Sequence, residues 1–235
     1  MLILKKIVAL AIIATFLASI PLAFADNNAG VIRVSYELKV DTNSAKPSGV
    51  GGAKVEPPYV LIAQGLMTTP ANLYFQPNDG EDSGFANAIA NSIVTYESNA
   101  GDLFKNPISQ SNLVGGVRDY KNVLVFGDLG STSTIAVTYA WITRGRTKVI
   151  VEFDIVFNTQ FDWGNPGDTS DTLYPVGFMD TENIVTHEMG HAVGLGDLYQ
   201  SQNAKATMFG YASNGETWKR TLESGDIAGL DALYP

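Results

Sequence analysis

The sequence predicts an α+β fold, in which helices pack against a β-sheet. Three observations indicate this class. Segments rich in β-branched and aromatic residues lie at 122–126, 135–142 and 148–158, separated by Gly or polar turns. A helical apolar pattern begins near Ser83. A second helical segment, further along the chain, contains both histidines at a spacing of four residues.

The composition excludes several classes of protein. The 235 residues include no Cys and two His, and 45% of them are hydrophobic, which is enough for one sizeable core. Without Cys there is no disulfide, no thiolate metal site and no cysteine nucleophile, so any metal must be held by His, Asp or Glu. A net charge of -9 without a basic cluster disfavours nucleic acid and anionic lipid as partners.

The first 25 residues have the pattern of a secretory signal peptide. Lys5 and Lys6 precede the uncharged run 7–25, which ends in Ala23-Phe24-Ala25. The alternative is an uncleaved anchor, because the 19 uncharged residues are almost long enough to span a bilayer. Pro21 and the A-x-A exit favour cleavage, after which no stable membrane insertion is expected. Both interpretations place the rest of the chain outside the cytoplasm.

Residues 26–71 are expected to form an N-terminal extension. They contain one strand-like stretch, 31–40, followed by a Ser-, Gly- and Pro-rich loop at 43–58. A linker and a removable propeptide-like segment both fit this pattern, and the residues do not separate the two. From residue 72 to residue 235 the patterning tightens, which predicts the main domain.

The main domain opens with a short strand and a long helix. A strand is expected at 73–76, followed by a turn at 77–80 and a helix from about Ser83. One helix face, expected to pack on the sheet, carries Phe85, Ile89, Ile93 and Tyr96.

The strand at 148–158 has two unlike faces. One face is apolar throughout, whereas the other carries Glu152 and Asp154. This alternation predicts a half-exposed strand or one at a sheet edge.

The last third of the chain contains an acidic loop and two helices. The loop at 162–171 has oxygen-bearing side chains that could bind Ca²⁺, but its ligand spacing is not recognisable, so a solvated loop is favoured. Asp180 is expected to cap a helix that runs through Val193, and a final helix is expected near 226–234.

The segment from Thr186 to Asp197 carries the chemistry. On a helix, His187 and His191 are one turn apart and point the same way, so both can reach one Zn²⁺ at about 2.0 to 2.1 Å. Glu188 lies beside them and is free to act on a water molecule. A third ligand must be an oxygen donor, and Asp197 is the nearest sensible choice, because Gly194 can adopt a positive φ and turn the chain back.

The resulting pattern, H-E-x-x-H-x-x-G-x-x-D, resembles the zinc motif of the metzincins. Its last position is Asp197 where most members have His, as in the snapalysin-like metzincins. The segment 206–211 resembles a Met-turn, with Met208 as its methionine. Segments 152–158 and 222–234 are similar to matrixin sequences, so the resemblance to secreted matrixin-type peptidases covers roughly 72–235.

This resemblance implies a catalytic domain and an activity. The expected fold is a twisted mixed sheet packed with helices, with the H-E-x-x-H helix at the active site and Met208 beneath the zinc. The expected function is a secreted zinc metalloendopeptidase, in which Glu188 is the general base for a zinc-activated water. The substrate, a protein or peptide, is expected to lie extended along the strand at 149–158.

Two residues remain ambiguous. Glu223, which lies 32 residues after His191, is a rival third ligand because thermolysin-like enzymes take a Glu from a later helix, although Gly194 and Met208 favour Asp197. Tyr211 stands three residues after Met208, where some metzincins have a Tyr after two. It is either a stabiliser of the transition state or a structural residue.

One alternative function remains at the level of sequence. The chain could be a non-catalytic extracellular zinc-binding or surface-structural protein on a metzincin scaffold. Glu188 favours the enzyme, because zinc binding alone does not require it. Matrixins commonly keep themselves latent with a propeptide thiolate, which this chain lacks. Latency would need a carboxylate, a steric block or a separate inhibitor.

Overall fold

The computed structural model describes residues 30–42, 57–78, 82–164 and 177–235. The expected signal peptide at 1–25 and most of the acidic loop at 162–171 lie outside the described residues. So does part of the expected turn at 77–80. Among the described residues, no helix is long and apolar enough to cross a membrane.

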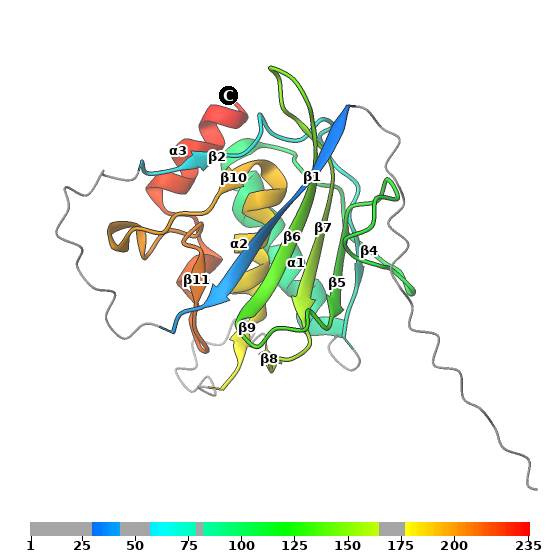
Figure 1. Ribbon diagram of the computed structural model, residues 1–235, viewed down its shortest axis with the longest axis vertical. Coiled ribbons are helices and arrows are strands. Elements are labelled where there is room, and N and C mark those ends of the chain that lie inside the picture. The colour runs from blue at the N-terminus through cyan, green and yellow to red at the C-terminus, as the bar shows by residue number, and fades with distance from the viewer. Residues whose placement is uncertain (1–29, 43–56, 79–81, 165–176) are drawn as a thin grey trace, which may run out of the picture.

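A seven-stranded mixed sheet forms one layer of the molecule, in the order β11-β1-β6-β7-β5-β3-β4 (Figure 1). β7, β5, β3 and β4 run parallel to one another, whereas β6 is antiparallel to both β7 and β1. The strands are β1 (Val31–Val40), β3 (Tyr74–Gln76), β4 (Ile108–Ser109), β5 (Val123–Gly127), β6 (Thr134–Thr143), β7 (Ile150–Asn158) and β11 (Tyr211–Ala212). Two small sheets pair β10 (Leu195–Gly196) with β2 (Val60–Leu61), and β8 (Trp163–Gly164) with β9 (Met179–Asp180).

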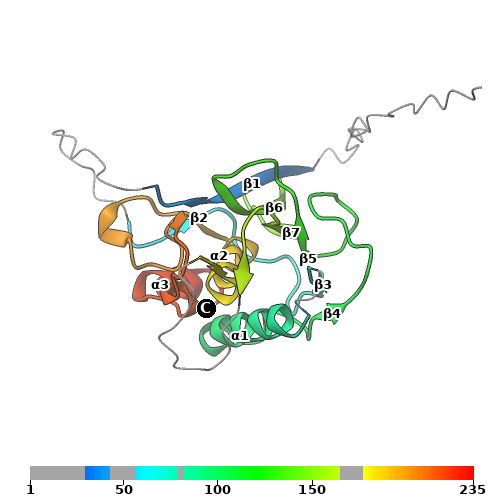
Figure 2. The same ribbon diagram turned by 90° about the horizontal axis from the view of Figure 1, so that it is seen from below.

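The helices cover one face of the large sheet, as Figure 2 shows. They are α1 (Asp82–Ala100), α2 (Thr181–Val193) and α3 (Ser224–Leu233), with short 3-10 turns at η1 (Ser201–Asn203) and η2 (Trp218–Arg220). The expected α1 face is confirmed, because its four apolar residues are buried in the core. Rings of α1, β5, β7 and β8 meet edge to face beneath it, which is the preferred geometry for aromatic pairs. The three strands expected at 122–158 and the two expected C-terminal helices are also confirmed.

The prediction of an edge position for β7 is wrong. β7 lies between β6 and β5, and Glu152 and Asp154 are 1% and 0% exposed. Their carboxylates are covered by the segment 116–123, which supplies backbone N–H donors. Asp119 and Tyr120 donate to Glu152 at 2.8 Å. The polar face of this strand therefore meets protein rather than water.

β1 is part of the large sheet. It pairs with β6 over nine residues and with β11 on its other side. The described part of the expected N-terminal extension is thus not a lightly structured linker, because residues 31–40 form a strand and residues 60–61 pair with β10. Whether residues 26–71 are removed stays a prediction, as does the boundary at residue 72.

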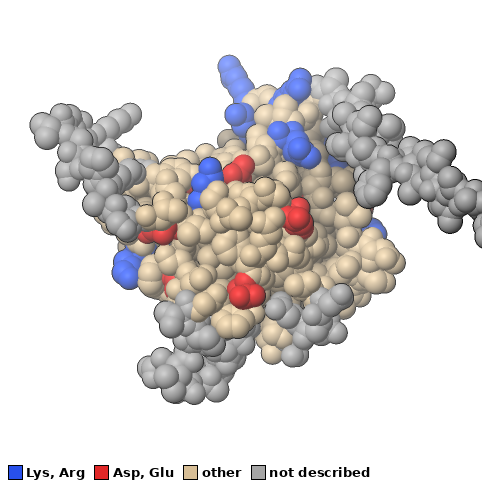
Figure 3. Space-filling model, turned by 60° about the horizontal axis from the view of Figure 1, so that its bottom comes forward, with Lys and Arg blue, Asp and Glu red and all other residues tan. Residues whose placement is uncertain are grey.

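The surface shown in Figure 3 carries few charged side chains. Lys and Arg gather at its upper end, and isolated Asp and Glu residues are spread over the rest. The turn between β6 and β7 is itself basic and exposed, with Arg144, Arg146 and Lys148. Most of this face is therefore uncharged.

Candidate active site

Helix α2 is capped at both ends by its own sequence. Asp180 accepts a hydrogen bond from the backbone N–H of Asn183 at 2.8 Å and forms an ion pair with Arg220. Every residue from Thr181 to Val193 is buried. Gly194 ends the helix with φ 110° and ψ 7°, a left-handed conformation that glycine adopts without strain. The chain then reverses through β10 toward the histidines.

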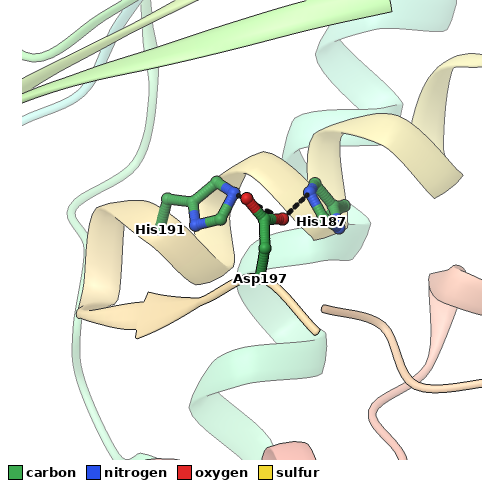
Figure 4. Close-up of side chains that lie close together, drawn as sticks. All are labelled: His187, His191 and Asp197. Carbon is green, nitrogen blue, oxygen red and sulfur yellow. Dashed lines mark ion pairs between the residues drawn. The ribbon is translucent and has the colours of Figure 1, made fainter. Parts of the chain in front are cut away.

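This reversal brings Asp197 to the two histidines (Figure 4). Its Oδ1 lies 3.4 Å from Nε2 of His187 and 3.4 Å from Nε2 of His191. One ligand atom from each residue lies within 4.8 Å of the other two. The histidines are 0% exposed and the Asp197 side chain is 7% exposed. The structure therefore gathers the three candidate ligands around one point.

Both imidazoles are oriented by backbone carbonyls. Nδ1 of His187 lies 2.7 Å from the carbonyl oxygen of Thr207, and Nδ1 of His191 lies 3.0 Å from that of Leu195. A carbonyl only accepts, so Nδ1 of each ring carries a proton, and Nε2, which faces Asp197, is the atom left to bind a metal. Nδ1 bonded in this way is the usual arrangement of metal-binding histidines.

The buried atoms fit a zinc ion. Nε2 of both histidines and Oδ1 of Asp197 are buried and have no hydrogen-bond partner. Such orphaned atoms are costly in a protein interior unless something binds them. Two imidazoles and a carboxylate are a donor set that zinc accepts, and they leave a fourth position for a reactant.

The electrostatics keep Asp197 ionised. Burial alone would raise its pKa, but the adjacent His191 and His187 together hold the pKa well below its ordinary value. The hydroxyl of Tyr199 also donates to Oδ2 of Asp197 at 3.1 Å. Asp197 thus remains an anion that attracts a cation.

Glu188 lies next to the cluster. One carboxylate oxygen, Oε2, accepts a hydrogen bond from the hydroxyl of Thr138 on β6. The other, Oε1, is buried without a hydrogen-bond partner. Burial raises the pKa of Glu188, while His187, His191 and the Thr138 bond act in the opposite direction. One oxygen is therefore fixed and the other is available to a proton.

Met208 packs against α2 at Gly190. A Cβ atom at position 190 would lie 2.1 Å from Sδ of Met208, so only glycine admits this contact. Met208 is 2% exposed, and its backbone N–H and that of Thr207 donate to the carboxylate of Asp226. The Met208 segment is thus held against the helix turn that lies between the two histidines.

Neither of the two ambiguous residues is among the clustered ligands. Glu223 is exposed and caps α3, where it forms a capping box with Asp226. Its role is structural, and it is not among the clustered ligands. The Tyr211 ring contacts those of Tyr199 and Phe209, and it is Tyr199 that reaches Asp197. A catalytic role for Tyr211 stays a prediction.

Three residues at the site were missed by the sequence reasoning. Thr138 bonds Glu188 from β6, Tyr199 bonds Asp197, and the ring of Tyr36 on β1 stacks on His191 at 4.7 Å between centroids. Thr138 and Tyr36 are distant in sequence from the motif, and no local pattern marks them. Tyr199 stands two residues after Asp197, and this proximity was an available signal.

The comparison with protein families identifies the C-terminal part of this site. Residues 131–235 match the family model of matrixin. Over these residues, a little under half of the chain, it is similar to the matrixins. The match includes β6, β7, α2 and Met208, so the elements around the ligand cluster lie within it. The chain has the α+β fold that the sequence predicts, and the match supports a zinc metallopeptidase that acts on proteins or peptides.

The other comparisons add little. Among solved structures, the chain is similar to high choriolytic enzyme 1, a hatching enzyme zinc-protease from the medaka fish Oryzias latipes. The identity is 10% and the TM-score 0.32, over 69% of this chain and 88% of that one. This likeness is weak. No curated protein sequence matches the chain.

Proposed function

We propose that this chain is a secreted, matrixin-like zinc endopeptidase in which His187, His191 and Asp197 bind one zinc ion. Glu188 is the general base of the proposed reaction. The observation that carries the proposal is the set of buried, unpartnered Nε2 and Oδ1 atoms gathered within 4.8 Å. The backbone acceptors at both Nδ1 atoms support it, because they orient the rings as metal ligands need.

The chemistry divides between the metal and the chain. Zinc, when bound, polarises the scissile carbonyl and lowers the pKa of a coordinated water. Glu188 takes a proton from the attacking water at its free Oε1 and passes it to the leaving amine. Thr138 holds the opposite oxygen, Oε2, so that the carboxylate keeps its orientation during the transfer. Thr138 and Glu188 therefore act together in the proposed proton transfer.

The position of the substrate follows from the sheet. A peptide pairing with β7 is excluded, because β7 is paired on both sides. β6 is the strand that touches Glu188, through Thr138. We therefore place an extended substrate along β6, on the edge that β1 occupies in this structure, held by backbone hydrogen bonds.

Secretion is the other half of the proposal. The charged start, uncharged run and A-x-A exit of residues 1–25 support it. Signal cleavage would leave a mature chain that begins near Asp26. N-terminal sequencing of protein exported by a secreting host is the direct measurement, and an intact residue 1 on membrane-bound material would favour the anchor instead.

The deciding experiment measures zinc content and casein hydrolysis on the same samples. We expect about one zinc per chain, activity that is lost to 1,10-phenanthroline, and no zinc in His191→Ala. Glu188→Gln should keep its zinc and lose at least about 100-fold in rate, the scale of a general base. Asp231→Asn, which changes an exposed carboxylate on α3, is the matched control and should behave as wild type.

Two outcomes would overturn the proposal. Full turnover by Glu188→Gln would remove Glu188 from the mechanism. Zinc binding without hydrolysis under any condition, including in the β1 variants described below, would favour a non-catalytic zinc protein on the same scaffold.

A further inference from the structure

The slot between β6 and β11 is filled by the chain's own β1. On one side β1 runs antiparallel to β6, from the pair Val31 and Thr143 to the pair Lys39 and Thr134. On the other side it runs parallel to β11, where Lys39 pairs with Tyr211 and Val40 with Ala212. β1 is therefore an extended segment with main-chain partners on both edges.

β1 crosses the candidate active site. Tyr36 is paired with Thr138, the residue that bonds the Glu188 carboxylate. The Tyr36 ring stacks on His191 with an interplanar angle of 23°. Figure 1 shows β1 crossing in front of α2, and Figure 2 shows that it lies directly above this helix. The middle of β1 thus lies at the level of the candidate zinc ligands.

This arrangement closes the site. His187, Glu188 and His191 are 0% exposed. β6 is paired with β7 on one edge and β1 on the other, so it has no free edge for a peptide. An endopeptidase must admit an extended substrate to its zinc, and nothing can pair with β6 while β1 is in place.

β1 is held as a docked peptide would be. Its side chains alternate, with Arg33, Ser35, Glu37 and Lys39 exposed to solvent. On the inner face only Leu38 is fully buried, at 0% exposure, and the others are half-buried. β6 and β7, by contrast, are buried almost throughout. Backbone pairing on both edges and a mostly half-buried apolar inner face therefore hold β1 in place.

We propose that residues 31–40 are a resident inhibitory segment that occupies the peptide-binding cleft in place of substrate. This inference rests on the proposed function, because it takes the buried cluster to be the catalytic site. The block is steric and needs no thiol, which agrees with the absence of Cys. Hydrolysis then requires β1 to leave β6, either by reversible undocking or by removal of the segment.

The first test weakens β1 within the full chain. Leu38→Asp places a charge at a fully buried position, whereas Lys39→Asp puts the same side chain at the neighbouring exposed position. We expect Leu38→Asp to raise kcat/KM on a fluorogenic peptide at least about tenfold, because it shifts the population toward the open site. Lys39→Asp should stay within about twofold of wild type. If circular dichroism shows that Leu38→Asp is unfolded, Tyr36→Ala repeats the comparison with a milder change, and Ser35→Ala is its control.

The second test does not depend on turnover. Release of zinc to 1,10-phenanthroline should be slow in wild type and faster in Leu38→Asp and Tyr36→Ala, because β1 shields the ligands. A synthetic peptide of residues 30–42 should inhibit the activated variant in competition with substrate. The same peptide with Asp in place of Tyr36 and Leu38 is its control and should not inhibit.

The outcomes distinguish this inference from the proposed function. Wild type that hydrolyses peptide as fast as folded Leu38→Asp and Tyr36→Ala would overturn the inhibitory role and leave the enzyme intact. Failure of the 30–42 peptide to inhibit would also overturn it. Zinc-loaded, folded variants that hydrolyse nothing would instead contradict the proposed function.

Discussion

At the scale of single residues, two buried aspartates behave in opposite ways. Asp197 has two imidazoles beside it, which lower its pKa despite burial. No imidazole lowers the pKa of Asp154. Burial, then the nearby Glu152, raises it to about 8, against three backbone N–H bonds. Charge partners therefore decide which of these carboxylates stays ionised.

The raised pKa of Asp154 predicts a loss of stability as pH rises. Between its ordinary pKa of 3.8 and about 8, the folded state holds a proton that the unfolded state has lost, so the free energy of unfolding falls with pH. Urea titrations in EDTA at pH 5 and pH 8.5 should differ by on the order of 1 kcal/mol or more. Asp154→Asn should flatten this dependence, whereas Asp231→Asn should not. Equal slopes in wild type and Asp154→Asn would contradict the assignment.

In the proposed reaction Thr138 is a positioning residue, because it contacts the general base Glu188 rather than the reacting atoms. Thr138→Val keeps the shape of this buried side chain but removes the hydroxyl that bonds Oε2. We expect a loss of about tenfold in kcat with unchanged zinc content, since one hydrogen bond to a charged group is worth roughly 1.5 kcal/mol or more. Thr138→Ser should restore the rate. A Ser variant as slow as the Val variant would mean that Thr138 serves packing alone.

At the scale of elements, the reversal after α2 builds the site. Helix α2 presents both histidines, the left-handed Gly194 ends it, and β10 pairs with β2 to direct Asp197 back. The Met208 segment then packs on the same helix turn and supplies, through Thr207, the acceptor for His187. Each of these steps requires two segments of backbone to lie close together.

The contact at Gly190 gives a prediction for this element. Gly190→Ala would place a methyl group 2.1 Å from Sδ of Met208 and 2.8 Å from the hydroxyl oxygen of Tyr96. We expect it to lower the free energy of unfolding by about 1–3 kcal/mol, as overpacking usually does, and to weaken zinc binding. Gly177→Ala, which meets nothing within 4 Å, is the control. Chemical denaturation checks both, and Gly190→Ala combined with Met208→Ala should recover part of the loss.

Strand β7 shows why the position of a strand in the sheet could not be predicted from its own residues. Its alternation correctly predicted a strand with one apolar face, but the polar face was assigned to solvent. Glu152 and Asp154 are instead bonded by N–H groups of the segment 116–123. A carboxylate satisfied by backbone donors looks the same in sequence as one satisfied by water.

At the scale of the whole molecule, the chain lacks covalent cross-links. It has no Cys, so a bound zinc would add a strong tie between α2 and the segment after Gly194, beside the ion pair of Asp180 with Arg220. The ligands lie within eleven residues, from His187 to Asp197, and the core around them is contributed by the sheet and α1. Metal and fold are therefore expected to stabilise each other.

This coupling predicts a zinc-dependent melting temperature. Zinc at about 100 times its Kd should add about 2.7 kcal/mol, which raises Tm by roughly 5–10 °C for a chain of this size. Differential scanning calorimetry with zinc, and with EDTA, measures the shift. His191→Ala should melt at the same temperature in both buffers. A shift of equal size in His191→Ala would place the stabilising zinc elsewhere.

The sequence by itself determined the parts of this protein that depend on local spacing. The one-turn separation of His187 and His191, the helix end at Gly194 and the return of Asp197 follow from backbone geometry within eleven residues. Only the tertiary structure decided that Thr138 orients Glu188, that β7 is central and that Tyr36 covers His191. These contacts join residues at least 50 positions apart or depend on strand order, and the register that creates them is set by packing of the whole sheet rather than by any local pattern.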